Sequence, residues 1–154
     1  MTSGGENRGS SKGALCPETR VTAVAHGSTI STTSTVTRVQ VLVVDDDDDQ
    51  RHLLRIHFEN AGCDVTVAES AESAIIAYQG EDIDLAVTEL LLPGMDGWTL
   101  SERIGVDQPE CRIAICSVLD KENYPSACVP LPKPVTRASV RRVLQRYVPR
   151  WVSP

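Results

Sequence analysis

Five residues of this sequence have the chemical types needed to hold a phosphoryl group. Asp45 and Asp46 follow one short apolar run, Glu89 follows a second, Ser117 a third, and Lys133 comes after a fourth. Two or three carboxylates and a backbone carbonyl make a fair Mg²⁺ site. A lysine and a hydroxyl opposite them would bind phosphoryl oxygens, or an anion that replaces them. These types together outline phosphoryl chemistry.

The five residues can meet only if the runs before them are parallel strands of one sheet. Short apolar runs that end in acid, such as "VLVVDD" at 41–46, are typical of buried parallel strands. Similar runs lie at 83–89, 112–117 and 127–134, and "CDVTVAES" at 63–70 predicts a further strand. Because parallel strands end at one edge of the sheet, this edge would collect the five residues.

The segments between these strands have the spacing of amphipathic helices. Apolar residues recur every three or four positions in 48–61, 70–79, 95–105 and 136–148. Ser70 is a candidate N-cap, and Gly62 suits a helix end. Strands that alternate with helices predict an α/β fold, a doubly wound five-stranded parallel sheet with helices on both faces.

Length and composition predict one domain with a tail at each end. The 154 residues are 41% hydrophobic and 23% charged, with a formal net charge of −6 that does not suggest general affinity for nucleic acid. Residues 1–37 are rich in Gly, Ser and Thr and predict a disordered tail; 38–149 would form the domain and 150–154 a C-terminal tail. The five residues after Pro149 are too few for an output domain, so we expect a stand-alone domain.

The five cysteines and the lack of targeting signals favour a cytoplasmic protein. The cysteine count is odd and shows no C-x-x-C spacing, which favours reduced thiols over disulfides or a metal site. No segment is long enough to cross a bilayer, and the first twenty residues lack the apolar core of a signal peptide. We therefore expect no membrane association.

Four motifs in order resemble one known family. "VLVVDD", "LLLPGMDG", "ICSV" and "LPKP" together resemble the receiver domain of bacterial two-component response regulators, over about residues 38–149. The resemblance implies a flavodoxin-like fold with strand order 2-1-3-4-5. It also implies a regulatory, non-enzymatic role in a phosphorelay, with a histidine kinase or a downstream regulator as protein partner. Homodimer formation stays open, and nucleic acid is not an expected partner.

The resemblance assigns roles by position. Asp45 and Asp46 match the acid pair that holds Mg²⁺, and the backbone carbonyl of Leu91 matches its third protein ligand. Ser117 matches the hydroxyl that contacts the phosphoryl group, and Lys133 matches the lysine that pairs with it. The peptide bond between Lys133 and Pro134 is often cis in the family.

Three departures from the family pattern set this chain apart. The phosphate-accepting aspartate is replaced by Glu89, which is longer by one methylene. The aromatic residue that switches inward with the hydroxyl is replaced by Pro130. Residues 118–127 leave room for about one helical turn, where the family has a full fourth helix, and Pro125 limits it further. These departures predict weak or lost Mg²⁺ binding and a site without its switch.

Several interpretations remain open. The domain could be a pseudo-receiver that binds a partner without phosphate control, Glu89 could act as a phosphomimic, or the site could still be phosphorylated. Asp45 and Asp47 also fit the opening motif of a small haloacid-dehalogenase-like phosphatase. That class needs an acidic pair after the lysine, and this chain has no Asp or Glu beyond Lys133. The pseudo-receiver is the preferred interpretation.

The last helix is predicted to carry a basic face. Arginines stand at 137, 141, 142, 146 and 150, with no acid after Lys133. Such a set is typical of a solvated face. It could also dock an acidic protein surface, and nucleic acid is the weaker alternative.

Overall fold

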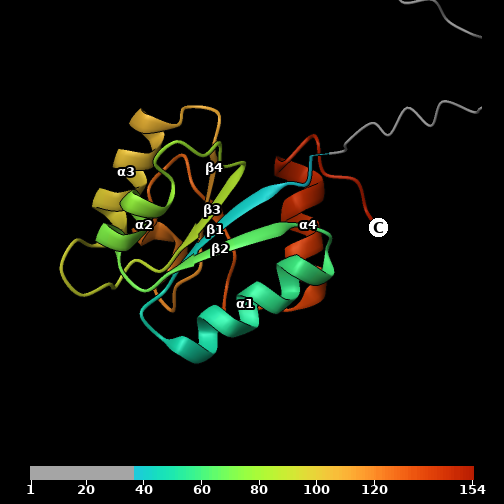
Figure 1. Cartoon of the computed structure of the whole chain (residues 1–154). Coiled ribbons are helices and arrows are strands. Elements are labelled where there is room, and N and C mark those ends of the chain that lie inside the picture. The colour runs from blue at the N-terminus through green and yellow to red at the C-terminus, as the bar shows by residue number, and fades with distance from the viewer. Residues whose placement is uncertain (1–36) are drawn as a thin grey trace, which may run out of the picture. The chain divides into compact units, whose positions relative to one another are not determined.

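Five parallel strands form a single sheet at the centre of the domain (Figure 1). The computed structural model describes residues 37–154; residues 1–36, nearly all of the predicted disordered tail, lie outside the described part. The sheet has the order β2-β1-β3-β4-β5, which confirms the predicted topology. Its strands are β1 (Gln40–Val44), β2 (Asp64–Ala68), β3 (Leu85–Thr88), β4 (Arg112–Ile115) and β5 (Val129–Pro130).

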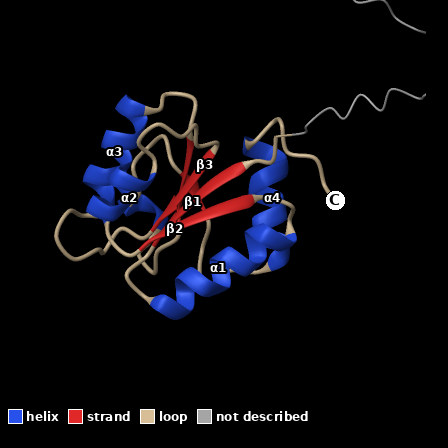
Figure 2. Cartoon of the chain, in the orientation of Figure 1, coloured by secondary structure: helices blue, strands red, loops and turns tan. Residues whose placement is uncertain are grey.

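Within residues 37–154, α-helices cover both faces of the sheet (Figure 2). Side chains of α1 and α4 share one buried cluster with the strands, and side chains of α2 and α3 share the other. Both faces are therefore covered, as the continuous apolar strands predicted. The helices are α1 (Asp48–Asn60), α2 (Ala71–Ala77), α3 (Gly97–Asp107) and α4 (Arg137–Tyr147), with a 3₁₀ turn, η1 (Lys121–Asn123).

Side-chain caps fix where the helices begin. Asp47 accepts a hydrogen bond from the backbone N–H of Gln50, and Asp96 accepts one from Thr99 in the same way. Ser70, the predicted N-cap, forms a reciprocal capping box with Ser73. The same box joins Thr136 and Ser139 at the start of α4. Each cap satisfies backbone donors that would otherwise lack a partner.

The residues predicted as a C-terminal tail pack against the domain. The Trp151 side chain is buried, and its indole N–H donates a 2.8 Å hydrogen bond to the carbonyl of Ala61, just after α1. Arg150 pairs with Asp84, just before β3, and donates to the carbonyls of Thr37 and Arg38. These contacts hold the last residues against the edge of the sheet where β1, β2 and β3 begin. Among residues 37–154, no helix has the length and hydropathy needed to cross a membrane.

Candidate functional site

The carboxyl ends of the central strands meet at one edge of the sheet, where Glu89 lies. The backbone N–H of Glu89 donates to the carbonyl of Val44, so the ladder runs one residue past the end of β3. In the same way, the backbone N–H of Cys116 donates to the carbonyl of Thr88, so the pairing of β4 with β3 runs one residue past the end of β4. Glu89 is consequently held deep in the edge, with 5% of its surface exposed.

Both carboxylate oxygens of Glu89 have partners. Oε1 accepts the backbone N–H groups of Leu90 at 2.8 Å and Leu91 at 3.2 Å. Oε2 accepts a hydrogen bond from the Lys133 ammonium at 2.8 Å. The side chain thus turns back over its own loop and at the same time reaches the lysine. Charge-assisted hydrogen bonds of this kind are about twice as strong as neutral ones.

Asp45 completes a triad with Glu89 and Lys133. Its Oδ2 lies 3.3 Å from Lys133 Nζ, and its Oδ1 accepts the backbone N–H of Asp47 at 3.0 Å. Asp45 is 1% exposed, so it is removed from water almost completely. One ammonium therefore faces two buried carboxylates.

The triad shifts the pKa values of its members in different directions. Burial alone would raise the pKa of Glu89, but hydrogen bonds from Lys133, Ser117 and the Leu91 N–H together hold this pKa below its ordinary value. Burial raises the pKa of Asp45, and its hydrogen bond from Asp47 and the charge of Lys133 offset only part of the rise. Burial would lower the pKa of Lys133, but its hydrogen bond to Glu89 and the two carboxylate charges raise it. The lysine and Glu89 are therefore both ionised near neutral pH.

Ser117 is buried at the end of β4, beside the triad. Its hydroxyl oxygen accepts the backbone N–H of Leu119 at 3.3 Å. Its carbonyl accepts a 3.2 Å hydrogen bond from the hydroxyl of Tyr124. Of the predicted site residues, the structure thus brings Asp45, Glu89 and Lys133 into direct contact and places Ser117 next to them.

Asp46 does not join this contact group, and Leu91 joins it through its backbone N–H alone. Asp46 is exposed just after β1, and Leu91 is 54% exposed in the turn after β3. The Asp46 side chain has no hydrogen-bond or ion-pair partner among residues 37–154. The Lys133–Pro134 peptide bond is cis, as the resemblance implied.

The turn after β3 depends on a close approach of two backbones at Gly97. An added Cβ on Gly97 would lie 2.2 Å from the carbonyl oxygen of Glu89 and 2.7 Å from Cα of Leu90. The Gly97 N–H donates to the Leu90 carbonyl at 2.9 Å. Only glycine allows this approach, so the first residue of α3 fixes the position of the loop over which Glu89 turns.

The segment between β4 and β5 contains a single short turn in place of a full helix, as its length predicted. Its only helical piece is the 3₁₀ turn η1, and Trp98 at the start of α3 donates an indole hydrogen bond to the carbonyl of Asn123 in this turn. Pro130 is half-buried in β5 and carries no aromatic ring. Sequence reasoning missed Tyr124, the aromatic residue that reaches the end of β4 instead. Its place in a ten-residue segment next to the site was the available signal.

The Lys133 ammonium balances the charge of Asp45 and Glu89 in this arrangement. No group of three or more His, Cys, Asp or Glu side chains in the described part of the chain is already arranged to hold a metal. Each oxygen of Asp45 accepts one hydrogen bond, so each keeps a lone pair that a Mg²⁺ ion would use. Asp45, Asp46 and the carbonyl of Leu91 would hold such an ion, with Lys133 as a competing cation.

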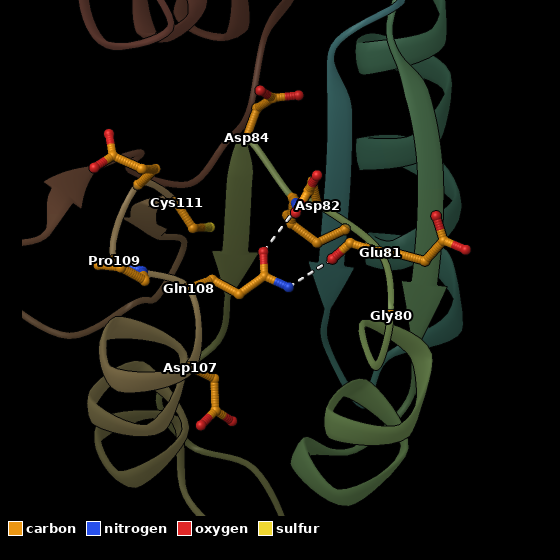
Figure 3. Close-up of a pocket in the computed structure, with 10 residues that line it drawn as sticks. Gly80, Glu81, Asp82, Asp84, Asp107, Gln108, Pro109 and Cys111 are labelled. Atoms are coloured by element: carbon orange, nitrogen blue, oxygen red, sulfur yellow. Dashed lines mark hydrogen bonds between the residues drawn. The ribbon is translucent and has the colours of Figure 1, made fainter. Parts of the chain in front are cut away.

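A hollow of about 580 Å³ lies at the opposite edge of the sheet, beside the loops that lead into β3 and β4 (Figure 3). The Gln108 side chain spans it, accepting the Ile83 N–H and donating to the carbonyl of Glu81. Two of its acids already have cationic partners: Asp84 pairs with Arg150, and Asp107 with Arg103. The amide bridge joins two loops, and the hollow shares no residue with the triad.

The fold is a doubly wound α/β domain, and the triad lies at the carboxyl edge of its parallel sheet. The model of the response regulator receiver domain family matches residues 41–132, more than half of the chain. The chain belongs to this family, whose members serve two-component signalling. Of the residues that suggested the family from sequence, Asp45, Glu89 and Lys133 are in contact and Ser117 lies beside them, while Asp46 stays apart.

Known relatives include proteins of different sizes. The chain is 34% identical to an uncharacterized 14.6 kDa protein of Leptolyngbya boryana, over 73% of this chain and 92% of that one. It is 30% identical to a cyclic di-GMP phosphodiesterase of Thermotoga maritima, over 58% and 24%. It is 34% identical to the response regulator receiver protein CpdR of Brucella abortus, over 48% and 62%. The chain thus spans less than two thirds of the last two relatives.

Solved structures show the same fold. The receiver domain protein of Clostridium thermocellum superimposes with a TM-score of 0.67 at 21% identity, over 73% of this chain and 95% of that one. NtrX of Brucella abortus, solved with ATP, gives 0.68 at 25% identity, over 73% and 27%. TrrA of Thermotoga maritima, solved with Mg²⁺ and BeF, gives 0.66 at 20% identity, over 71% and 99%.

Proposed function

We propose that this domain is a pseudo-receiver: it regulates a partner protein through surface contacts and is not phosphorylated on residue 89. Receivers pass signals between kinases and effector proteins, so the partner would be a histidine kinase or a downstream regulator. The observation that carries the proposal is the engagement of Glu89, whose two oxygens are held by Lys133 and by the N–H groups of Leu90 and Leu91.

An attacking carboxylate needs a free lone pair in line with the phosphodonor. Glu89 is 5% exposed, its Oε1 already accepts two backbone N–H groups and its Oε2 already accepts Lys133, so a single lone pair of Oε2 is left for attack. Misplacement of a nucleophile by about 1 Å can cost on the order of a hundredfold in rate. The extra methylene of glutamate is a displacement of that size.

The surrounding segment supports a fixed site. Pro130 has no side chain that could swing inward, and Tyr124 ties the 118–127 segment to the carbonyl of Ser117. A receiver that switches needs two arrangements of this region. Here the hydroxyl of Tyr124 and the indole of Trp98 hold one arrangement from two sides.

A phosphomimic is the second candidate. The observation that favours it is the 2.8 Å contact from Glu89 to Lys133, because the lysine would contact a phosphoryl group in a phosphorylated receiver. In this version Glu89 holds the domain permanently in an active-like state. Both versions predict the same absence of phosphorylation on Glu89 and differ in whether residue 89 controls partner choice.

Phosphorylation is tested by incubating the full chain with acetyl phosphate or phosphoramidate and Mg²⁺, followed by intact mass measurement and peptide mapping. A competent receiver treated in parallel shows that the donors are active. We expect no phosphoryl adduct on Glu89. A stable phosphoryl group mapped to this residue would overturn the proposal and restore the working phosphoacceptor.

Partner binding separates the two versions. The full chain and its Glu89→Asp variant are used side by side to capture partners, each with and without the phosphodonor. Unchanged partners in all four samples support the pseudo-receiver. Partners that change when the variant becomes phosphorylated support the phosphomimic. A generic aryl phosphate assay checks the phosphatase alternative, for which we expect no turnover, since Asp47 already caps α1.

A further inference from the structure

A hollow of about 260 Å³ lies between the end of α1 and the first half of α4, away from the triad. Figure 1 shows the two helices next to each other on one face of the sheet. Among residues 37–154, no acidic side chain lines the hollow. Its walls are His57, Asn60 and Ala61 from α1 and its end, Arg137 and Arg141 from α4, and Pro154.

The charge of this region is opposite to that of the rest of the chain. Residues 133–154 contain one lysine, five arginines and no Asp or Glu, so they carry six positive charges. Because the formal net charge is −6, the remaining residues carry twelve net negative charges. The hollow therefore lies in the basic part of an otherwise acidic protein, which favours small anions there.

The two arginines of the hollow are available to a ligand. Arg137 and Arg141 are one helical turn apart, so their side chains leave the same side of α4. None of the ion pairs in residues 37–154 involves either of them. Arg141 donates one hydrogen bond, to the hydroxyl of Ser153 at 2.6 Å. The nearest acid on α1, Glu59, is engaged by Arg55.

His57 and Asn60 supply the opposite wall. The ring Nδ1 of His57 is buried and has no hydrogen-bond partner in the described residues. Because water does not reach this atom, Nδ1 itself offers no hydrogen bond to the hollow, and the part that His57 plays there is to line the wall. The end of a helix carries partial negative charge, which would repel an anion. Here, however, the carbonyls of His57, Phe58, Glu59 and Ala61 already accept N–H donors, which reduces that charge.

We propose that this hollow binds a phosphate group, either inorganic phosphate or the phosphate of a small monoester. Guanidinium groups bind phosphate through two parallel hydrogen bonds, and two arginines on one helix face offer this to one anion. The histidine ring and the Asn60 amide complete a polar wall on the other side. The site is separate from Glu89, so it does not depend on the proposed function.

The test uses the ¹⁵N-labelled full chain and follows the Asn60 side-chain amide and the Trp151 indole N–H by NMR. Trp151 is a built-in reporter because its indole donates to Ala61 in the wall of the hollow. Sodium phosphate and phenyl phosphate are titrated separately, against sodium chloride at equal ionic strength. We expect saturable shifts for at least one phosphate, with a Kd on the order of 1 mM; the two titrations tell free phosphate from a monoester.

Two double variants with the same charge change decide the outcome. Arg137→Gln/Arg141→Gln should weaken binding at least tenfold. Arg142→Gln/Arg146→Gln alters arginines on another side of α4 and should keep the Kd within twofold. Equal weakening by both, or shifts that chloride reproduces, would overturn the proposal. If the first double variant is unfolded, Arg141→Lys replaces it: loss of the planar fork should weaken binding several-fold, and unchanged affinity would contradict the site.

Discussion

Replacing Lys133 with methionine tests the triad most directly, because it leaves two buried carboxylates without their cation. Nζ lies 2.8 Å from Glu89 and 3.3 Å from Asp45, whose surfaces are 5% and 1% exposed. Breaking a buried ion pair by removing one partner costs about 3–5 kcal/mol. The Lys133 side chain remains 19% exposed, so we expect the free energy of unfolding to fall by an amount near the lower limit, about 3 kcal/mol at pH 7.

The loss should depend on pH with a definite sign. In the wild type the pKa of Glu89 is lowered, so its stabilisation is present above the unfolded value of about 4.3 and is lost as pH falls through the lower folded value. Without Lys133 the pKa of Glu89 rises, and that of Asp45, already raised, rises further. The variant therefore loses stability as pH rises from about 4 to 7, and the difference from wild type narrows near pH 4.

Urea unfolding followed by the fluorescence of Trp98 and Trp151 measures this loss. For an m-value of about 2 kcal/mol/M, 3 kcal/mol lowers the midpoint by roughly 1.5 M with an unchanged slope. Lys121→Met, at an exposed lysine in η1, is the control and should change stability by less than about 0.5 kcal/mol. A loss below about 1 kcal/mol for Lys133→Met at pH 7, or an equal loss near pH 4, would refute the buried triad.

Three further perturbations probe the turn, the segment and the metal. Gly97→Ala should destabilise by about 2 kcal/mol or more, because its Cβ would meet the Glu89 carbonyl at 2.2 Å; near-wild-type urea unfolding would contradict this close approach. Tyr124→Phe should lower the free energy of unfolding by about 1 kcal/mol and speed amide hydrogen exchange in residues 118–127, because it removes the hydrogen bond to the Ser117 carbonyl. Unchanged exchange would contradict a role for this hydrogen bond in holding the segment. Calorimetry should give a Kd for Mg²⁺ on the order of millimolar or weaker, and no binding in Asp46→Ala, because Asp45 and Glu89 are engaged by Lys133. Tight Mg²⁺ binding in that variant would disprove this prediction.

The strands and the residues at their ends were predictable because they follow from short-range patterns, whereas the strand order followed from the resemblance to the receiver family. Continuous apolar runs such as 41–44 and 85–88 cannot be exposed, and parallel pairing then brings their ends to one edge. The cap at Ser70 and the single turn in place of a fourth helix followed from side-chain chemistry and chain length. These features depend on residues close together in the sequence.

The detailed contacts that close the site depend on the packed fold and were not predictable. The sequence placed Glu89 and Lys133 at one edge, but which carboxylate oxygen the lysine contacts is decided by how the glutamate turns over its own loop. Trp151 returns to Ala61 across 90 positions, although the last five residues look like a tail. Such pairings are fixed by the packed fold as a whole.

In the proposed pseudo-receiver, Glu89 and its neighbours act together to hold the site in one arrangement. A longer carboxylate alone could still leave the nucleophile free, since an extra methylene adds a rotor. The two N–H groups of the Leu90–Leu91 loop remove that freedom, and Gly97 holds the loop in place. Lys133 then binds the second oxygen, and Tyr124 holds the segment beside it. Glu89→Asp alone would therefore shorten the side chain without releasing the segment, which is why we expect it to leave partner choice unchanged.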